Sequence, residues 1–324
     1  MKEKEEIFKF LKKEFPSIKR DIPLKKYTTF KIGGPAEYFL IANYKKDLLR
    51  AVTTTQKLKI PIFIMGGGSN LLVSDKGLKG IVVRVNSKDS VILKSGNIVE
   101  APTGANLGKV VDFSIKKYLK GLEWAGGLPG TFGGAIRGNA GAFGGEIKDS
   151  IFQVEALDNN FKLRKLSNKQ CKFSYRNSIF KQKNWIVLSA SLKLKKGNRE
   201  ELRKIADSHI EYRKDKHPLE YPNAGSIFKN VDFKKISQET QKIFLDKVKK
   251  DPFEIVPSAW FIIGAGLTGK KVGQAQVSEK HSNYIVNRGN AKALDVLRLI
   301  DLITKKVKDK YNINLEVEIQ LVGF

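Results

Sequence analysis

The chain has 324 residues, 41 % of them hydrophobic, and this length and composition predict a folded protein with two domains or more. The 60 Lys and Arg against 33 Asp and Glu give a net charge of +27, which points to an anionic partner, although no nucleic-acid recognition motif accompanies the scattered basic residues. A single cysteine excludes an internal disulfide, the apolar runs are too short to span a bilayer, and the charged start excludes a secretory signal, so we expect a cytoplasmic protein without membrane insertion.

The first 200 residues alternate between helical and strand patterns. Apolar residues recur at helical spacing over residues 2–15, and two more helices are expected at 45–57 and 106–119. Short apolar runs bounded by turn residues predict strands at 38–42, 60–65, 80–85, 91–93, 98–102, 151–158 and 184–194.

Beyond residue 198 the sequence is more charged and more helical. We expect helices at 199–215, 233–251 and 290–311, the last with Asn290 as its N-cap, and a final strand at 314–322. The whole pattern predicts an α+β protein in which an N-terminal domain to about residue 198 is followed by a second α+β domain.

Two glycine-rich stretches stand out, MGGGSN at residues 65–70 and a segment at 127–149 that holds eight glycines. Each glycine in ordered backbone costs about 0.5–1 kcal/mol relative to alanine, so this density needs a reason. Successive bare N–H groups can bind a diphosphate, and missing side chains let backbone approach a flat cofactor. The alternative is a set of glycine turns in a tightly packed region.

A third glycine-rich segment, GAGLTGKK at 264–271, fits two phosphate-binding patterns only weakly. Lys271 stands where a P-loop needs a hydroxyl for Mg²⁺, and the sequence that follows is too broken to form the helix of a dinucleotide fingerprint. We therefore predict a structural turn there.

Seven segments then occur in the order typical of one enzyme family: YTTFKIGGPAEYFL, IMGGGSNLLVSD, GLPGTFGGAIRGNAGAFGGEI, SYRNSIFK, NAGSIFKN, GQAQVSEKHSNYIVNRGNAKALDVL and LEVEIQLVG. From about residue 20 to 324 the chain resembles the UDP-N-acetylenolpyruvoylglucosamine reductase (MurB) family. The spacing between the SYRNS and NAGS motifs resembles the subgroup without the tyrosine-bearing lid loop.

The resemblance implies a fold and a division into domains. We expect an FAD-binding fold of the vanillyl-alcohol-oxidase type over residues 1–203, in two subdomains at about 1–85 and 86–203. A smaller α+β substrate-binding domain is expected at 204–305. The C-terminal segment 306–324 carries the glutamate of the family's active site.

The implied activity is the NADPH-dependent reduction of the enolpyruvyl ether of UDP-N-acetylglucosamine enolpyruvate to UDP-N-acetylmuramate, a step of peptidoglycan precursor synthesis. FAD is the implied cofactor, and since no histidine lies between residues 31 and 208 we expect no covalent attachment through histidine. The implied FAD-binding residues are Gly66, Gly67, Gly68, Ser69, Asn70, Leu71, Gly127, Pro129, Gly130, Thr131, Gly133, Gly134, Asn139, Gly141 and Ile147.

Three residues match the family's catalytic positions. Arg176 would bind the substrate carboxylate, which a planar guanidinium can hold with two hydrogen bonds. Ser226 would donate the proton to a carbanion-like intermediate, and Glu318 would complete the site that polarises the carboxylate. Glu316 lies two residues away on the same strand, and we favour Glu318 because it directly precedes the apolar end of the motif.

The resemblance also suggests substrate contacts from Tyr175, Lys229 and Asn230. The three histidines lack metal-ligand spacing, so we expect no metal, and we expect a monomer. Two other functions remain open at this stage. A sugar or hydroxy-acid oxidase would keep the FAD fold, whereas a basic nucleic-acid-binding module would bind no flavin.

Overall fold

The structure is a computed structural model that describes residues 2–324. Among those residues no helix is both long and apolar enough to cross a membrane. Contacts divide the chain into two compact units, and each unit is made of separate pieces of sequence. The first contains residues 2–22, 35–67 and 78–210, and the second contains 23–34, 68–77 and 211–324.

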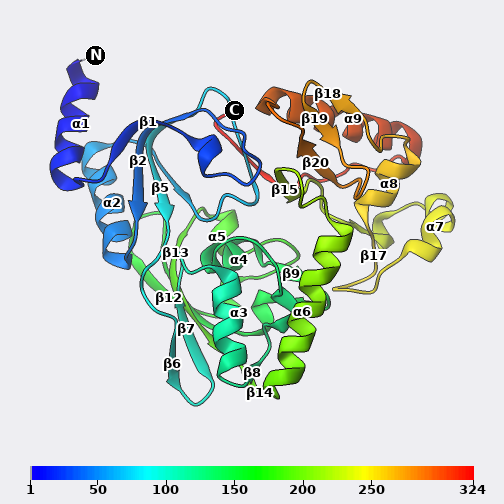
Figure 1. Cartoon of the computed structure of the whole chain (residues 1–324), viewed down its shortest axis with the longest axis horizontal. Helices are drawn as coiled ribbons and strands as arrows, with labels where there is room; N and C mark the ends of the chain where they lie inside the picture. Colours follow the sequence, from blue (N-terminus) through cyan, green and yellow to red (C-terminus); the bar gives the residue numbers. More distant parts are fainter. Residues whose placement is uncertain (1) are drawn as a thin grey trace. The chain divides into compact units, whose positions relative to one another are not determined.

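One sheet of the first unit has the strand order β1 (Lys19–Pro23), β2 (Pro35–Ala42), β5 (Leu78–Val85) and β3 (Ile62–Met65). β5 pairs in parallel with both β2 and β3, and its near-continuous apolar sequence is typical of a parallel strand buried on both faces. Two amphipathic helices, α1 (Lys2–Glu14) and α2 (Lys45–Leu58), pack beside these strands and enclose one hydrophobic core (Figure 1).

The other large sheet of the first unit has the order β12 (Leu163–Ser167), β11 (Ile151–Leu157), β13 (Ile186–Lys193), β7 (Ile98–Pro102) and β6 (Ile92–Ser95), all antiparallel. The helices α3 (Leu107–Lys116) and α4 (Phe132–Gly138) share a second hydrophobic core with it. Shorter elements complete this unit: β8 (Leu119–Lys120), η2 (Glu123–Ala125), β9 (Gly141–Ala142), β10 (Gly145–Glu146), η3 (Ile147–Asp149), η4 (Lys169–Cys171), α5 (Ile179–Gln182) and β14 (Lys195–Lys196).

The helix α6 (Arg199–Lys216) carries the chain into the second unit. There, β15 (Asn223–Ser226), β20 (Tyr284–Asn287), β19 (Ala275–Val277) and β18 (Lys271–Val272) form an antiparallel sheet, and α9 (Ala293–Tyr311) and α8 (Ser258–Gly264) pack into its core. The remaining pieces are η1 (Leu24–Lys26), β4 (Leu71–Val73), β16 (Val231–Asp232), η5 (Phe233–Lys235), α7 (Gln238–Phe244), η6 (Leu245–Lys247), β17 (Ile255–Val256) and β21 (Gln320–Val322).

Most predicted elements are confirmed, but three expectations near the C-terminus are wrong. Residues 233–251 form only the short α7 between single 3-10 turns. The helix α9 begins at Ala293, and its first free N–H groups are bound by the carboxylates of Asp75 and Asp295, so Asn290 is not the N-cap. The predicted strand at 314–322 is regular only in β21, which pairs in parallel with β4.

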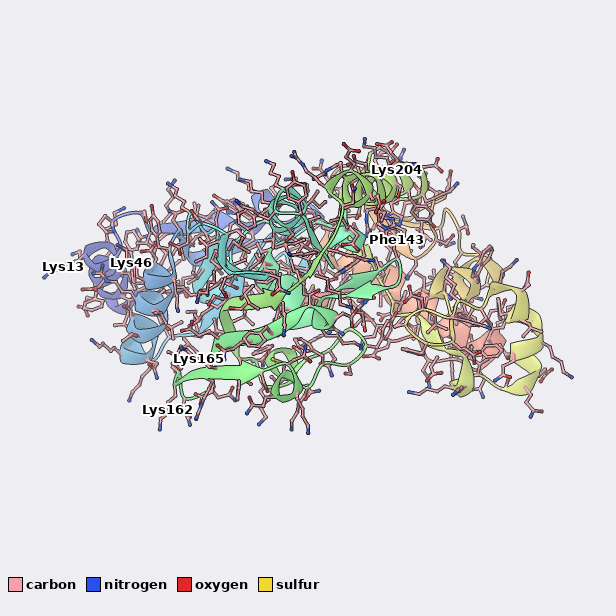
Figure 2. All side chains as sticks on the ribbon, turned by 90° about the horizontal axis from the view of Figure 1, so that it is seen from below. Lys13, Lys46, Phe143, Lys162, Lys165 and Lys204 are labelled. Carbon is pink, nitrogen blue, oxygen red and sulfur yellow. The ribbon has the colours of Figure 1, made fainter. Side chains whose placement is uncertain are left out.

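The positive charge of the first unit is spread over separate elements. Figure 2 labels five lysines of this unit, and their side chains extend from the surface. They come from α1, α2, α6, β12 and the turn before β12, and all are exposed: Lys13, Lys46, Lys204, Lys165 and Lys162. The scatter expected from the sequence is therefore present in the fold.

Candidate active site

The two glycine-rich stretches meet in the first unit. A Cβ atom on Gly66 would lie 2.3 Å from Oγ1 of Thr131, and one on Gly67 would lie 2.9 Å from Cα of Gly130. Neither distance is possible between non-bonded atoms, so glycine at residues 66 and 67 is required for the two loops to pack. Tight packing of glycine turns, the alternative interpretation of the sequence, therefore accounts for Gly66 and Gly67.

Thr131 starts the helix α4, where its hydroxyl accepts a hydrogen bond from the Gly134 N–H at 3.3 Å. The next turn is just as tight, because a Cβ on Gly133 would lie 1.8 Å from Oγ1 of Thr103. Gly134 differs: it is exposed, and only Thr131 Oγ1, at 3.4 Å, lies within 4 Å of the position of its missing Cβ. Gly127 and Pro129 are exposed as well. Bare backbone at the start of α4 is therefore open to a flat, anionic group.

Asn139 ends α4 in the left-handed conformation, with φ of 44°. It is fully buried, and its amide donates to Glu146 Oε1 and to the Ser174 carbonyl, both at 3.0 Å. Its side-chain oxygen accepts from the Lys148 N–H at 3.2 Å. Asn139 is one of the implied cofactor-binding residues, and its side-chain hydrogen bonds fix the loop that follows α4.

Arg176 lies next to that loop and also has a left-handed backbone, with φ of 54°. Its Nη2 donates to the Gly141 carbonyl at 2.8 Å, and its guanidinium lies over the Tyr175 ring at 4.9 Å from the centroid. Phe143, which Figure 2 labels, stacks on His209 of α6 with 3.9 Å between ring centroids and steadies the same loop. A planar guanidinium with five N–H donors has the geometry to bind a carboxylate with two parallel hydrogen bonds.

The remainder of the first glycine-rich stretch belongs to the second unit. Gly68 has φ of 67°, and a Cβ there would lie 2.3 Å from the Tyr27 carbonyl oxygen. The backbone then enters β4, whose partner is β21. Asn70 precedes this strand: its amide donates to the Glu318 carbonyl at 3.3 Å, and its own carbonyl accepts from the Gln320 N–H at 2.9 Å.

Ser226 ends β15 directly opposite Tyr284 of β20. The Tyr284 hydroxyl lies 3.2 Å from Nδ1 of His217. Burial raises the pKa of Tyr284 to about 12, and the positive charge of Arg213 opposes that shift. The Glu318 N–H donates to the carbonyl of Ile227, the residue after Ser226, so two of the three predicted catalytic residues lie on adjacent segments of backbone. Arg176 belongs to the first unit.

The structure distinguishes the two candidate glutamates. The Glu316 side chain is 70 % exposed and forms an ion pair with Lys229. Glu318 is half-buried, and its N–H donates to the Ile227 carbonyl at 2.7 Å, which ties it to the strand that carries Ser226. This placement favours Glu318 for a role beside Ser226.

The implied substrate residues Lys229 and Asn230 follow Ser226 along the chain. The Lys229 side chain is only 14 % exposed, and its carbonyl accepts a hydrogen bond from the Ser258 hydroxyl. The Asn230 side chain accepts from the Ser258 N–H at 3.2 Å and so caps the start of α8. Across residues 2–324, no group of three or more acidic, histidine or cysteine side chains could hold a metal ion.

Sequence reasoning missed Tyr284 and His217. The Tyr284 hydroxyl lies 3.2 Å from Nδ1 of His217, and burial lowers the pKa of His217 to about 4. The only signal in the sequence was that Tyr284 belongs to a motif of the family, and nothing in that motif predicted which residue it would face.

Comparisons with known proteins agree with this geometry. The family model of an FAD binding domain matches residues 36–167, and that of the UDP-N-acetylenolpyruvoylglucosamine reductase C-terminal domain matches 217–322. The UDP-N-acetylenolpyruvoylglucosamine reductase of Caldanaerobacter subterraneus is 43 % identical over 93 % of this chain and 92 % of its own, and that of Clostridium novyi is 40 % identical over 94 % and 92 %. The crystal structure of the reductase from Thermus caldophilus superposes with a TM-score of 0.74 at 29 % identity, covering 94 % of this chain and 99 % of that one. The expected FAD-binding fold followed by an α+β domain is confirmed.

Proposed function

The chain belongs to the UDP-N-acetylenolpyruvoylglucosamine reductase family. We propose that Arg176, Ser226 and Glu318 are the side chains that take part in catalysis, beside the chemistry that FAD supplies. The enzyme is an FAD-dependent oxidoreductase that uses NADPH to reduce the enolpyruvyl ether of UDP-N-acetylglucosamine enolpyruvate. The observation that carries the assignment is the backbone hydrogen bond from Glu318 to Ile227, the residue after Ser226, whereas the Glu316 side chain forms an ion pair with Lys229.

The residues present fit the cofactor. FAD supplies hydride-transfer chemistry when it is bound. The exposed bare backbone at Gly127 and Gly134 suits its diphosphate, and the packed contacts of Gly66 and Gly133 fix the shape of that backbone. In this proposal the remaining implied FAD-binding residues either line the same loops or, like Asn139, hold them in place.

The protein must stabilise negative charge on the substrate and then protonate it. Hydride addition to the alkene leaves a carbanion that spreads into the neighbouring carboxylate. Arg176 binds that carboxylate, and its attachment to the Gly141 carbonyl orients the guanidinium beforehand. Glu318 polarises the same group and, beside a developing dianion, acts as a neutral acid. Ser226 donates its hydroxyl proton to the carbon.

Substrate binding is assigned to the residues around Ser226. A diphosphate would compete with Glu316 for the ammonium group of Lys229, and Asn230 and Tyr175 would complete the contacts. We propose residues 204–305 as the substrate domain and 1–203 as the FAD domain, with 306–324 supplying Glu318. The 50 positions between Arg176 and Ser226 support the subgroup without the tyrosine lid. A monomer in the cytoplasm completes the proposal.

The test separates the two half-reactions under anaerobic conditions. NADPH should bleach the flavin, and the enolpyruvyl substrate should restore its absorbance. Ser226→Ala should leave bleaching unchanged and slow reoxidation by roughly 10²–10⁴-fold, the usual effect of removing a general acid. Equal losses in both half-reactions would contradict the assignment, because they would indicate disturbed flavin binding.

A matched pair tests the glutamate. At saturating substrate, Glu318→Gln should slow reoxidation, whereas Glu316→Gln should keep it near the wild-type rate. The reverse order would transfer the role to Glu316.

A further inference from the structure

The backbone that follows Ser226 lies between two other segments of the second unit. On one side is the C-terminal segment, where the Glu318 N–H donates to the Ile227 carbonyl at 2.7 Å. On the same side the Lys229 N–H donates to the Glu316 carbonyl at 2.8 Å. Ser226, Lys229 and Glu318 all have parts in the proposed function, so the position of this backbone decides where their side chains lie.

The other side of this backbone is held by a side chain, that of Asn283. One residue after Ser226, the Ile227 N–H donates to the Asn283 carbonyl at 2.8 Å. The Asn283 side chain then continues the pattern. Its Oδ1 accepts from the Phe228 N–H at 3.0 Å, and its Nδ2 donates to the Phe228 carbonyl at 2.8 Å. A side-chain amide that donates and accepts in this way takes the place of a residue on a neighbouring antiparallel strand.

Water does not compete for these two side-chain hydrogen bonds. Phe228 is fully buried, and Asn283 is 3 % exposed. A buried N–H or carbonyl that loses its partner keeps the full cost of its desolvation, so the backbone at Phe228 is confined to the position in which the Asn283 amide reaches both groups. Phe228 also forms an isolated antiparallel bridge with Val317, which keeps the segments of Ser226 and Glu318 in register.

We propose that Asn283 is a positioning residue, and that its two hydrogen bonds with Phe228 fix Ser226 relative to Glu318. The proposal rests on the proposed function, in which Ser226 donates a proton and Glu318 polarises the carboxylate of the same substrate. Both side chains must then reach their own atoms of one small group at once. A displacement of about 1 Å costs roughly 10²-fold in rate, so a rigid backbone between the two residues matters for the reaction. Asn283 acts through that backbone and needs no contact with the substrate.

The first test is Asn283→Leu, which keeps a side chain of similar size and removes both hydrogen bonds with Phe228. In the anaerobic assay at saturating substrate we expect reoxidation to slow by about 10–10²-fold, since the reacting groups lose their alignment, whereas reduction by NADPH should stay near the wild-type rate. Ser282→Ala is the matched control. Ser282 is 3 % exposed and belongs to the same loop, but its hydroxyl is hydrogen-bonded to Thr268 at 2.8 Å, so both half-reactions should be unchanged.

A double-mutant cycle separates positioning from a merely structural role. If Asn283 acts by holding the Ser226 hydroxyl in place, Asn283→Leu should slow reoxidation much less in a Ser226→Ala background than in the wild type, because the group that it positions is already absent. A structural defect would slow the reaction by the same factor in both backgrounds. That result would overturn the proposal.

The outcomes also distinguish this proposal from the proposed function. If the substrate does not reoxidise the wild-type flavin, the proposed function fails and the role of Asn283 fails with it. If the wild type is reoxidised and Asn283→Leu keeps its rate, or loses both half-reactions equally, only the role of Asn283 is overturned.

Should Asn283→Leu not fold, Asn283→Asp tests the same hydrogen bonds through pH. The introduced carboxyl group accepts from the Phe228 N–H in either form, but it donates to the Phe228 carbonyl only when it is protonated. Buried carboxyl groups have pKa values up to about 8–9, so the rate of reoxidation relative to wild type should rise as the pH falls from about 10 to 6. The wild-type profile removes the contribution of other titrating groups, including His281, whose Nδ1 accepts from the residue 283 N–H at 3.2 Å. A relative rate that stays constant over this range would overturn the proposal.

Discussion

Gly66→Ala should weaken the first unit through one contact, that between its two glycine-rich loops. The new Cβ would lie 2.3 Å from Oγ1 and 3.2 Å from Cγ2 of Thr131, so the threonine must rotate and release the Gly134 N–H. Losing a threonine N-cap costs roughly 0.5–2 kcal/mol, and overpacking costs about 1–3 kcal/mol. We therefore expect the free energy of unfolding to fall by about 2–4 kcal/mol.

A double-mutant cycle isolates that contact. Thr131→Ala alone should cost only the cap, about 1 kcal/mol. In that background Gly66→Ala should cost less than it does alone, because Oγ1 and Cγ2 are gone and only the Cβ of residue 131, at 3.3 Å, remains close. The two substitutions should thus be non-additive by about 1 kcal/mol or more.

Urea denaturation at a fixed FAD concentration measures these differences. In a Trp260→Phe background, Trp124 and Trp185 remain as fluorescent reporters of the first unit. Gly138→Ala is the control, because Gly138 lies in α4, the helix that Thr131 caps, and nothing is within 4 Å of its missing Cβ. We expect this substitution to be neutral or to stabilise the protein by up to about 1 kcal/mol. Additive costs, or a control as damaging as Gly66→Ala, would refute the reasoning.

Two further predictions concern buried titratable groups. Burial raises the pKa of the Cys171 thiol to about 12, so at pH 8 the folded protein should resist alkylation by iodoacetamide and react only when urea unfolds it; rapid labelling of the native protein would contradict this. Burial lowers the pKa of His217 to about 4, below the 6.5 of an exposed histidine, so the unfolded chain binds the proton more readily. The stabilising effect of a neutral His217 is complete above pH 6.5 and is lost as the pH falls toward 4. Thermal melts should show this slope in wild type and a shallower one in His217→Asn; parallel curves would argue against it.

Local patterns in the sequence predicted the elements that depend on local physics. The helices at 2–15 and 45–57 and the strand at 80–85 follow from periodicity, and turns do lie within residues 264–271, between α8 and β18. The roles of Arg176, Ser226 and Glu318 came from the order of motifs rather than from residue types and stay predictions.

Contacts between segments that are distant in the sequence could not be predicted from local patterns. The N-terminus of α9 is bound by Asp75, more than 200 positions earlier, so no local rule could find it. The same holds for Tyr284, whose hydroxyl contacts His217, 67 positions earlier in the chain. Gly66 shows a related limit: the sequence suggested an open cradle, whereas the missing side chain makes room for Thr131.

The pairing of β4 with β21 has a consequence for the synthesis of the protein. Leu71, Leu72 and Val73 are buried in the folded chain, yet the strand that covers them, Gln320–Val322, is translated roughly 250 residues later. At about 5–20 residues per second the ribosome needs on the order of 10–50 s to reach it. During that interval the second unit cannot close. The nascent chain presents an unpaired apolar strand after Asn70. This strand is a binding site for a chaperone that recognises extended hydrophobic segments.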